Sequence, residues 1–96
     1  MMRDYELVII VTPEIDETAT AEVVDKVKSW ITESGGSIES FDEWGRQKLA
    51  YLINKQKEGQ YYLFNLKLEP TAVANLERNF GLQESILRFL IINRDD

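Results

Sequence analysis

Cysteine and histidine are both absent from this chain of 96 residues. Without cysteine there is no disulfide, thiolate zinc site or cysteine nucleophile, and without histidine the commonest general base and zinc ligand are missing. The chain also lacks a secretory signal pattern and any apolar run near the roughly 20 residues of a membrane helix. The composition therefore predicts a soluble, cytosolic protein with no metal site, no cofactor and no membrane contact.

The length and composition are typical of one folded domain. Apolar residues make up 44% of the chain and charged residues 29%, which is enough apolar surface to build a core. Seventeen acidic residues against 11 basic ones give a net charge of −6. We therefore expect a single domain over residues 1–96, in which nucleic-acid binding would need a local cluster of cations.

The first half of the sequence predicts a strand, a helix and a long strand. Residues 5–11 form a nearly continuous apolar run typical of a buried strand. Asp16 is placed to cap a helix with apolar positions three or four residues apart, which the glycines at 35–36 can end. Residues 37–53 follow as a long strand, in which Gly45 marks a bulge.

The second half predicts a hairpin partner, a short helix and a last strand. The polar stretch 54–59 indicates a turn, and the aromatic stretch 61–68 indicates the strand that follows it. Pro70 suits the first turn of a helix, which Gly81 can close. The run 86–92 is almost entirely apolar, which is typical of a central strand.

The element order βαββαβ predicts an α+β fold, the ferredoxin-like split βαβ sandwich. Its four-stranded antiparallel sheet would carry both helices on one face, with strands 5–11 and 86–92 side by side in the middle. The other face, called the open face below, would carry no helix, so apolar side chains there must meet water or a partner. Periodicity does not decide whether the row of Tyr61 or the row of Tyr62 faces the helices.

Positive charge is concentrated in residues 46–57, called the basic segment below, which contain four basic residues and no acidic one. Arg46 and Lys48 share one face of their strand and Lys55 and Lys57 lie at the hairpin tip, so together they could follow a phosphate backbone. Three tyrosines nearby could stack on bases: Tyr51, Tyr61 and Tyr62. The alternative is that the lysines only protect a solvated sheet edge from aggregation.

The two tryptophans occupy different settings. Trp30 belongs to the apolar stripe of the first helix and is expected in the core. Trp44 precedes the glycine of the predicted bulge, where it either covers that glycine or lies outward as a partner contact. Aromatic side chains in both rows of 61–68 indicate that another protein covers the open face.

Nothing in the sequence points to catalysis. Adjacent acidic residues such as Asp42 and Glu43 point to opposite faces of a strand and do not converge on a metal. The glycines lie at turns and element ends, without the spacing of a phosphate-binding loop. We therefore expect a protein that is not an enzyme, with no catalytic residue and no small-molecule substrate.

Two segments of the sequence form recognisable motifs. One is the start, Arg3-Asp4-Tyr5-Glu6, and the other is the central run Glu43-Trp44-Gly45-Arg46-Gln47-Lys48-Leu49-Ala50-Tyr51-Leu52-Ile53. With the chain length and element order, these segments resemble the bacterial ribosomal protein six family of the small subunit. The chain departs from the family pattern at Leu52, where proline is frequent, and at Gln47, which removes one cation.

The resemblance implies a structural component of the small ribosomal subunit that binds the central domain of small-subunit ribosomal RNA as a heterodimer with ribosomal protein eighteen. A basic partner would let a net acidic chain bind RNA and would cover the open face. The residues then expected to contact RNA are Arg3, Arg46, Lys48, Lys55, Lys57 and Arg88. Those expected to contact the partner are Tyr5, Trp44, Tyr51, Tyr61 and Tyr62.

A second function is compatible with the same fold. Ferredoxin-like regulatory modules pair with a second copy of themselves, bind a small ligand at the seam and need no histidine. Such a module would be a stable homodimer, whereas the ribosomal hypothesis predicts a monomer that pairs with a different, basic protein. The oligomeric state therefore discriminates between the two hypotheses.

Overall fold

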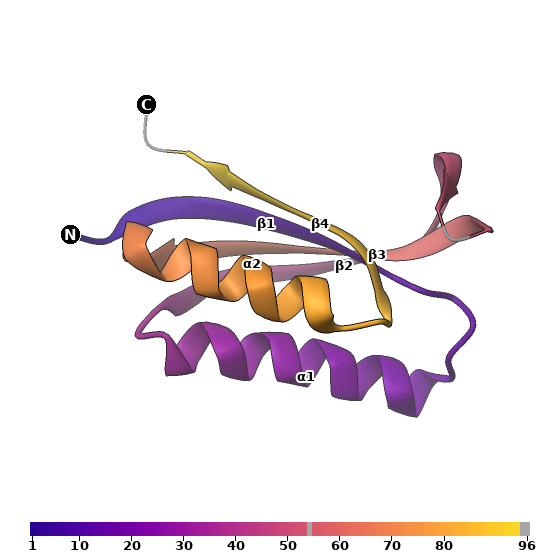
Figure 1. The fold of residues 1–96 in the computed structure, drawn as a ribbon, viewed down its shortest axis with the longest axis horizontal. Coiled ribbons are helices and arrows are strands. Elements are labelled where there is room, and N and C mark those ends of the chain that lie inside the picture. The colour runs from indigo at the N-terminus through magenta and orange to yellow at the C-terminus, as the bar shows by residue number, and fades with distance from the viewer. Residues whose placement is uncertain (54, 95–96) are drawn as a thin grey trace.

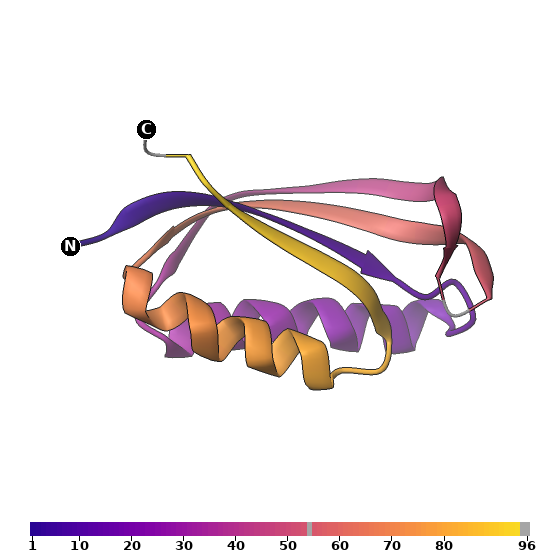
Figure 2. The same ribbon diagram turned by 45° about the horizontal axis from the view of Figure 1, so that its top comes forward.

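The computed structural model describes residues 1–53 and 55–94 and contains one antiparallel sheet with two helices packed on one face (Figure 1). Its elements are β1 (Arg3–Val11), α1 (Glu17–Glu33), β2 (Ser37–Ile53), β3 (Gln56–Leu68), the 3-10 helix η1 (Pro70–Ala72), α2 (Val73–Leu82) and β4 (Ile86–Asn93). Figure 2 shows both helices on the same side of the sheet. The predicted α+β fold and its element order are confirmed.

The strand order is β2-β3-β1-β4, so the prediction that β4 lies in the middle of the sheet is wrong. β1 is central, with β3 on one side and β4 on the other. β4 has an apolar sequence because both of its faces carry apolar side chains. Phe89 and Ile91 pack against the core, whereas Leu90 and Ile92 are exposed on the other face.

The predicted ends of α1 are confirmed. The Asp16 side chain accepts a hydrogen bond from the backbone N–H of Ala19 at 2.8 Å, which satisfies a donor that the first turn leaves without an intrahelical partner. After the helix, Gly35 adopts a φ of +90°, which glycine tolerates without steric cost. The second helix differs slightly from the prediction, because it continues through Gly81 and ends at Leu82.

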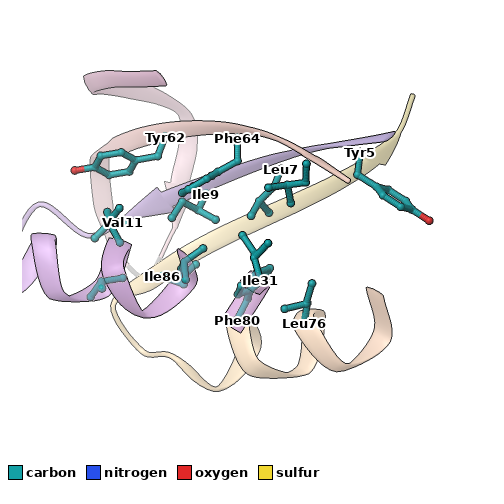
Figure 3. Close-up of a cluster of buried hydrophobic side chains, with 14 of the residues drawn as sticks. Tyr5, Leu7, Ile9, Val11, Ile31, Tyr62, Phe64, Leu76, Phe80 and Ile86 are labelled. Carbon is teal, nitrogen blue, oxygen red and sulfur yellow. The ribbon is translucent and has the colours of Figure 1, made fainter. Parts of the chain in front are cut away.

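The core lies between the helices and one face of the sheet (Figure 3). The row of β3 that faces the helices is the even-numbered one, and its side chains from residue 62 onward are buried: Tyr62, Phe64, Leu66 and Leu68. Phe80 of α2 has no exposed surface, and its ring lies 5.9 Å from that of Trp30 and 5.6 Å from that of Phe89. Trp30 thus packs against the core, as predicted.

The β2–β3 hairpin is longer and more irregular than predicted. β3 begins at Gln56, five residues before the expected start, because its polar first residues pair with β2. Asn54 of the predicted turn lies outside the described residues. The predicted bulge is confirmed by a register shift and a φ of +80° at Gly45. A larger shift follows: Lys48 pairs with Glu58 and Ile53 with Gln56, so residues 49–52 oppose Lys57 alone.

Candidate nucleic-acid and protein interface

The open face is formed by the alternate residues of each strand that point away from the helices. In its middle, Val8 of β1 pairs with Leu63 of β3 and with Leu90 of β4, while Ile10 pairs with Tyr61 and Arg88. Leu90 is 56% exposed, and Ile92, further along the same strand, is 42% exposed. The prediction of apolar side chains on an uncovered sheet face is confirmed.

Trp44 lies outward on the open face, which is one of the two positions that the sequence allowed. Its ring is stacked on that of Tyr61, with centroids 6.4 Å apart and planes 14° apart. The side chain is nonetheless 51% exposed. The bulge next to it places one extra residue of β2 opposite β3, which changes the direction of the side chains beyond that point. Trp44 therefore extends the apolar area toward the β2 edge.

The irregular pairing of residues 49–52 in β2 brings the Tyr51 side chain across the open face to β4, which forms the opposite edge of the sheet. Figure 1 shows the end of the hairpin rising from the sheet on the side away from the helices. The Arg88 guanidinium carbon lies 5.6 Å from the centroid of the Tyr51 ring, in cation–π geometry. Because β2 and β4 are the two edges of the sheet, only the raised hairpin makes this contact possible.

The cations of the basic segment differ in their partners. Arg46 lies opposite Gln60 in the register, and its guanidinium is 3.7 Å from the Glu58 carboxylate. Lys48, Lys55 and Lys57 are exposed, and none of them has an ion pair with another described residue. Three positive charges are therefore free to meet an anionic partner at this end of the sheet.

The other end of the open face is occupied by ion pairs. The Lys67 ammonium is 2.8 Å from the Asp4 carboxylate, and an Arg94 guanidinium nitrogen is 3.6 Å from the Glu6 carboxylate. The same Arg94 nitrogen donates a hydrogen bond to the Asn65 side-chain oxygen at 2.8 Å. Exposed pairs of this kind contribute about 0–1 kcal/mol each, but they neutralise the local charge. The open face thus has an apolar middle and a neutralised end, and the cations of the basic segment lie at the hairpin end of the sheet.

Two of the predicted contact residues are buried, and a third lies at the other end of β3. Tyr5 and Tyr62 are only 7% and 4% exposed and belong to the core, so the prediction that they contact a partner is corrected (Figure 3). Burial, and to a lesser degree the Glu43 carboxylate, raises the pKa of Tyr62 above its ordinary value of 10.0. Arg3 pairs with Leu68, the last residue of β3, whereas Lys57 is the second residue of that strand.

The exposed side chains of β4 were missing from the predicted site. Leu90 and Ile92 stand on the open face, but the apolar run that contains them was interpreted as a strand buried on both faces. Leu90 and Ile92 alternate with the half-buried Phe89 and Ile91. This alternation indicates an exposed row only when β4 is known to be an edge strand. Composition cannot distinguish the two cases, since both rows are apolar.

Neither a metal centre nor a membrane span is found in the described part of the chain. Among residues 1–53 and 55–94, no three acidic side chains come together as a possible metal site. Over the same ranges, neither helix has the length and hydropathy needed to cross a bilayer.

Known proteins resemble this chain over almost its whole length. The family model described as ribosomal protein S6 matches residues 4–93. A small ribosomal subunit protein bS6 from Clostridium novyi is 46% identical over 92 residues, which is 96% of this chain and 97% of the relative. One from Beutenbergia cavernae is 46% identical over 94 residues, or 98% of each chain. The crystal structure of 30S ribosomal protein S6 from Thermotoga maritima superposes with a TM-score of 0.93 at 28% identity, covering 98% of this chain and 89% of that one.

Proposed function

This chain belongs to the ribosomal protein S6 family, and from that premise we propose that it binds the central domain of small-subunit ribosomal RNA as a heterodimer with ribosomal protein eighteen. Membership makes the chain a structural, non-enzymatic component of the small ribosomal subunit, located with the ribosome in the cytoplasm. The RNA region and the identity of the partner are the parts that we propose.

The observation that carries the RNA contact is the set of unpaired lysines at one end of the sheet. Lys48, Lys55 and Lys57 are exposed without an ion pair among the described residues, although the chain as a whole carries a net charge of −6. Phosphates attract such cations and release condensed counterions when they bind, which favours binding at moderate salt. Arg46 supports the same contact, because its exposed pair with Glu58 is weak enough to be exchanged for a phosphate.

The partner contact is supported by the apolar middle of the open face. Trp44, Leu90 and Ile92 expose apolar surface there, next to the half-buried Val8 and Leu63. A contiguous exposed apolar area on a small protein marks an interaction surface. A partner with positive charge also complements the acidic chain and adds cations for RNA, so this chain need not supply the whole attraction.

A filter-binding titration tests the proposal. A labelled central-domain RNA fragment is titrated with this protein alone, with ribosomal protein eighteen alone and with an equimolar mixture. We expect tight binding only by the mixture. Binding by the mixture that equals binding by the partner alone would contradict the proposal. Sedimentation of this protein alone gives the complementary result, because a stable homodimer would favour the self-pairing regulatory module.

A further inference from the structure

The raised hairpin borders a cavity of about 350 Å³ on the open face, which is partly open to solvent. Val8, Ile10 and Leu90 contribute aliphatic walls from the two strands β1 and β4. Tyr51 of the hairpin, Tyr61 of β3 and Arg88 of β4 add two aromatic rings and a guanidinium group. Among residues 1–53 and 55–94, no acidic residue lines this cavity. It differs from the ribosomal contact described above, because it is a concave site for one chemical group.

The lining combines the groups that bind a nucleobase. Unpaired RNA bases are recognised by stacking on aromatic rings or on the plane of an arginine, and the arginine can also donate hydrogen bonds to base edges. Arg88 is already held 5.6 Å from the Tyr51 ring, so both groups are positioned before a ligand arrives. Tyr61 is supported from the other side by the stacked ring of Trp44. The cavity volume lies in the range of small-ligand sites, about 300–1,000 Å³.

The surroundings favour a nucleotide of an RNA chain over a side chain of a protein. A second hollow, of about 570 Å³, shares Tyr51 and is lined by Lys48 and Lys57. Its one carboxylate, that of Glu58, is 3.7 Å from the Arg46 guanidinium. The phosphates flanking an inserted base would therefore run past the ammonium groups of Lys48 and Lys57, which have no ion pair among the described residues. A basic segment of a protein would be repelled by the positive charges of Arg88, Lys48 and Lys57 around the cavity.

We propose that the cavity between the raised hairpin and the sheet receives one unpaired base of the bound RNA, stacked on Tyr51 and Tyr61 and contacted by the Arg88 guanidinium. This inference rests on the proposed RNA binding and assigns to RNA two tyrosines that the sequence placed at the partner interface. The register shift at residues 49–52 of β2 then places the stacking ring of Tyr51 over the sheet.

The test compares the variants Tyr51→Ala and Tyr51→Phe in the heterodimer, by filter binding to the central-domain RNA fragment. Loss of the ring should weaken binding about 5- to 150-fold, the equivalent of the roughly 1–3 kcal/mol that stacking contributes per base. Tyr51→Phe keeps the ring and should bind as the unsubstituted protein does. Leu82→Ala is the matched control, because Leu82 is exposed at the end of α2 and does not line the cavity. Urea unfolding of each variant checks the fold.

A cross-linking experiment adds a readout that does not depend on mutation. RNA substituted with 4-thiouridine is bound to the unsubstituted heterodimer and irradiated, and the tryptic peptides that carry RNA are identified. Cleavage after Lys48 and Lys55 isolates residues 49–55, so a cross-link on this peptide supports the inference. Its absence, together with unchanged affinity of Tyr51→Ala, would overturn the inference.

Two further outcomes separate this inference from the proposed function. Calorimetry of heterodimer formation without RNA should give the same affinity for Tyr51→Ala and for the unsubstituted protein. A weakened heterodimer would assign the cavity to the partner protein and overturn the inference. If Lys55→Ala/Lys57→Ala lowers RNA affinity while Tyr51→Ala does not, RNA binding stands and only the base pocket is wrong. If the unsubstituted heterodimer fails to bind the RNA, both fail together.

Discussion

Replacing Lys55 and Lys57 by alanine should reduce the salt dependence of RNA binding by the heterodimer. Each phosphate neutralised by a cation contributes about −0.9 to the slope of log K against log salt for B-DNA and about −0.7 for a single strand, and we use this range for RNA. Neither lysine has an ion pair among the described residues, so each can make one full contact. The slope should therefore become shallower by about 1.4 to 1.8.

The same numbers give the change in affinity that the assay must resolve. Between 50 and 200 mM salt, the loss of affinity should be smaller by a factor of about 7 to 12 in the double variant, because the salt concentration rises fourfold. Filter binding at five or more salt concentrations measures the slope directly. The slope is more informative than one affinity, since a general loss of fold would change the affinity without changing the slope in proportion.

A control with the same net charge distinguishes local contacts from a general field effect. Lys26→Ala/Arg78→Ala removes two exposed cations from α1 and α2, and either double variant changes the net charge from −6 to −8. The control should leave the slope unaltered. An unaltered slope in Lys55→Ala/Lys57→Ala would remove these lysines from the interface, and equal changes in both variants would refute the argument from position.

Three other predictions concern the open face, the core and pH. Ile92→Ser should weaken heterodimer formation in calorimetry without changing the urea midpoint, because Ile92 is exposed on the open face and does not line the cavity. Leu82→Ser, at an exposed position on α2, should change neither, and equal partner affinity for the two variants would contradict the proposed surface. Phe80→Ala should lower the free energy of unfolding by about 3–5 kcal/mol, because it empties a fully buried site between two aromatic rings. A loss below about 1 kcal/mol in urea titration would mean that the helix layer is loosely packed. Tyr62 has a raised pKa in the folded state, so the stability from its neutral form is fully present below pH 10.0 and declines as the pH rises above it. Unfolding measured between pH 8 and 11 should therefore show a smaller alkaline decline in Tyr62→Phe, and identical pH profiles would contradict the assigned cause.

Local patterns were sufficient for the elements and for the ends of α1. The Asp16 cap and the helix end at Gly35 depend on hydrogen bonds and φ values within a few residues. They can therefore be predicted from the adjacent residues in the sequence. The start of β3 was placed too late because its first residues are polar, although an exposed hairpin can pair polar residues as well as apolar ones. Strand pairing depends on the partner strand, which no local window contains.

The position of β4 shows why the strand order could not be derived from hydrophobicity. An edge strand with two apolar faces and a central strand have the same apolar composition, and here Leu90 and Ile92 are exposed where a central position was expected. The same limit applied to Tyr61 and Tyr62, because both rows of β3 contain aromatic residues. A register shift of one residue exchanges the two faces, so only pairing and packing decide which row is buried.

The sequence by itself determined the segregation of charge into the basic segment, the order of the elements and the family motif through Trp44 and Tyr51. These depend on residue identity and on spacings of two to four residues, which the chain carries whether or not it is folded. Tertiary structure alone decided that Tyr5 and Tyr62 are buried and that Tyr51 reaches Arg88 across the sheet. The last contact joins the two edge strands and depends on the register shift in β2 as well as on the strand order, neither of which is a property of any local segment.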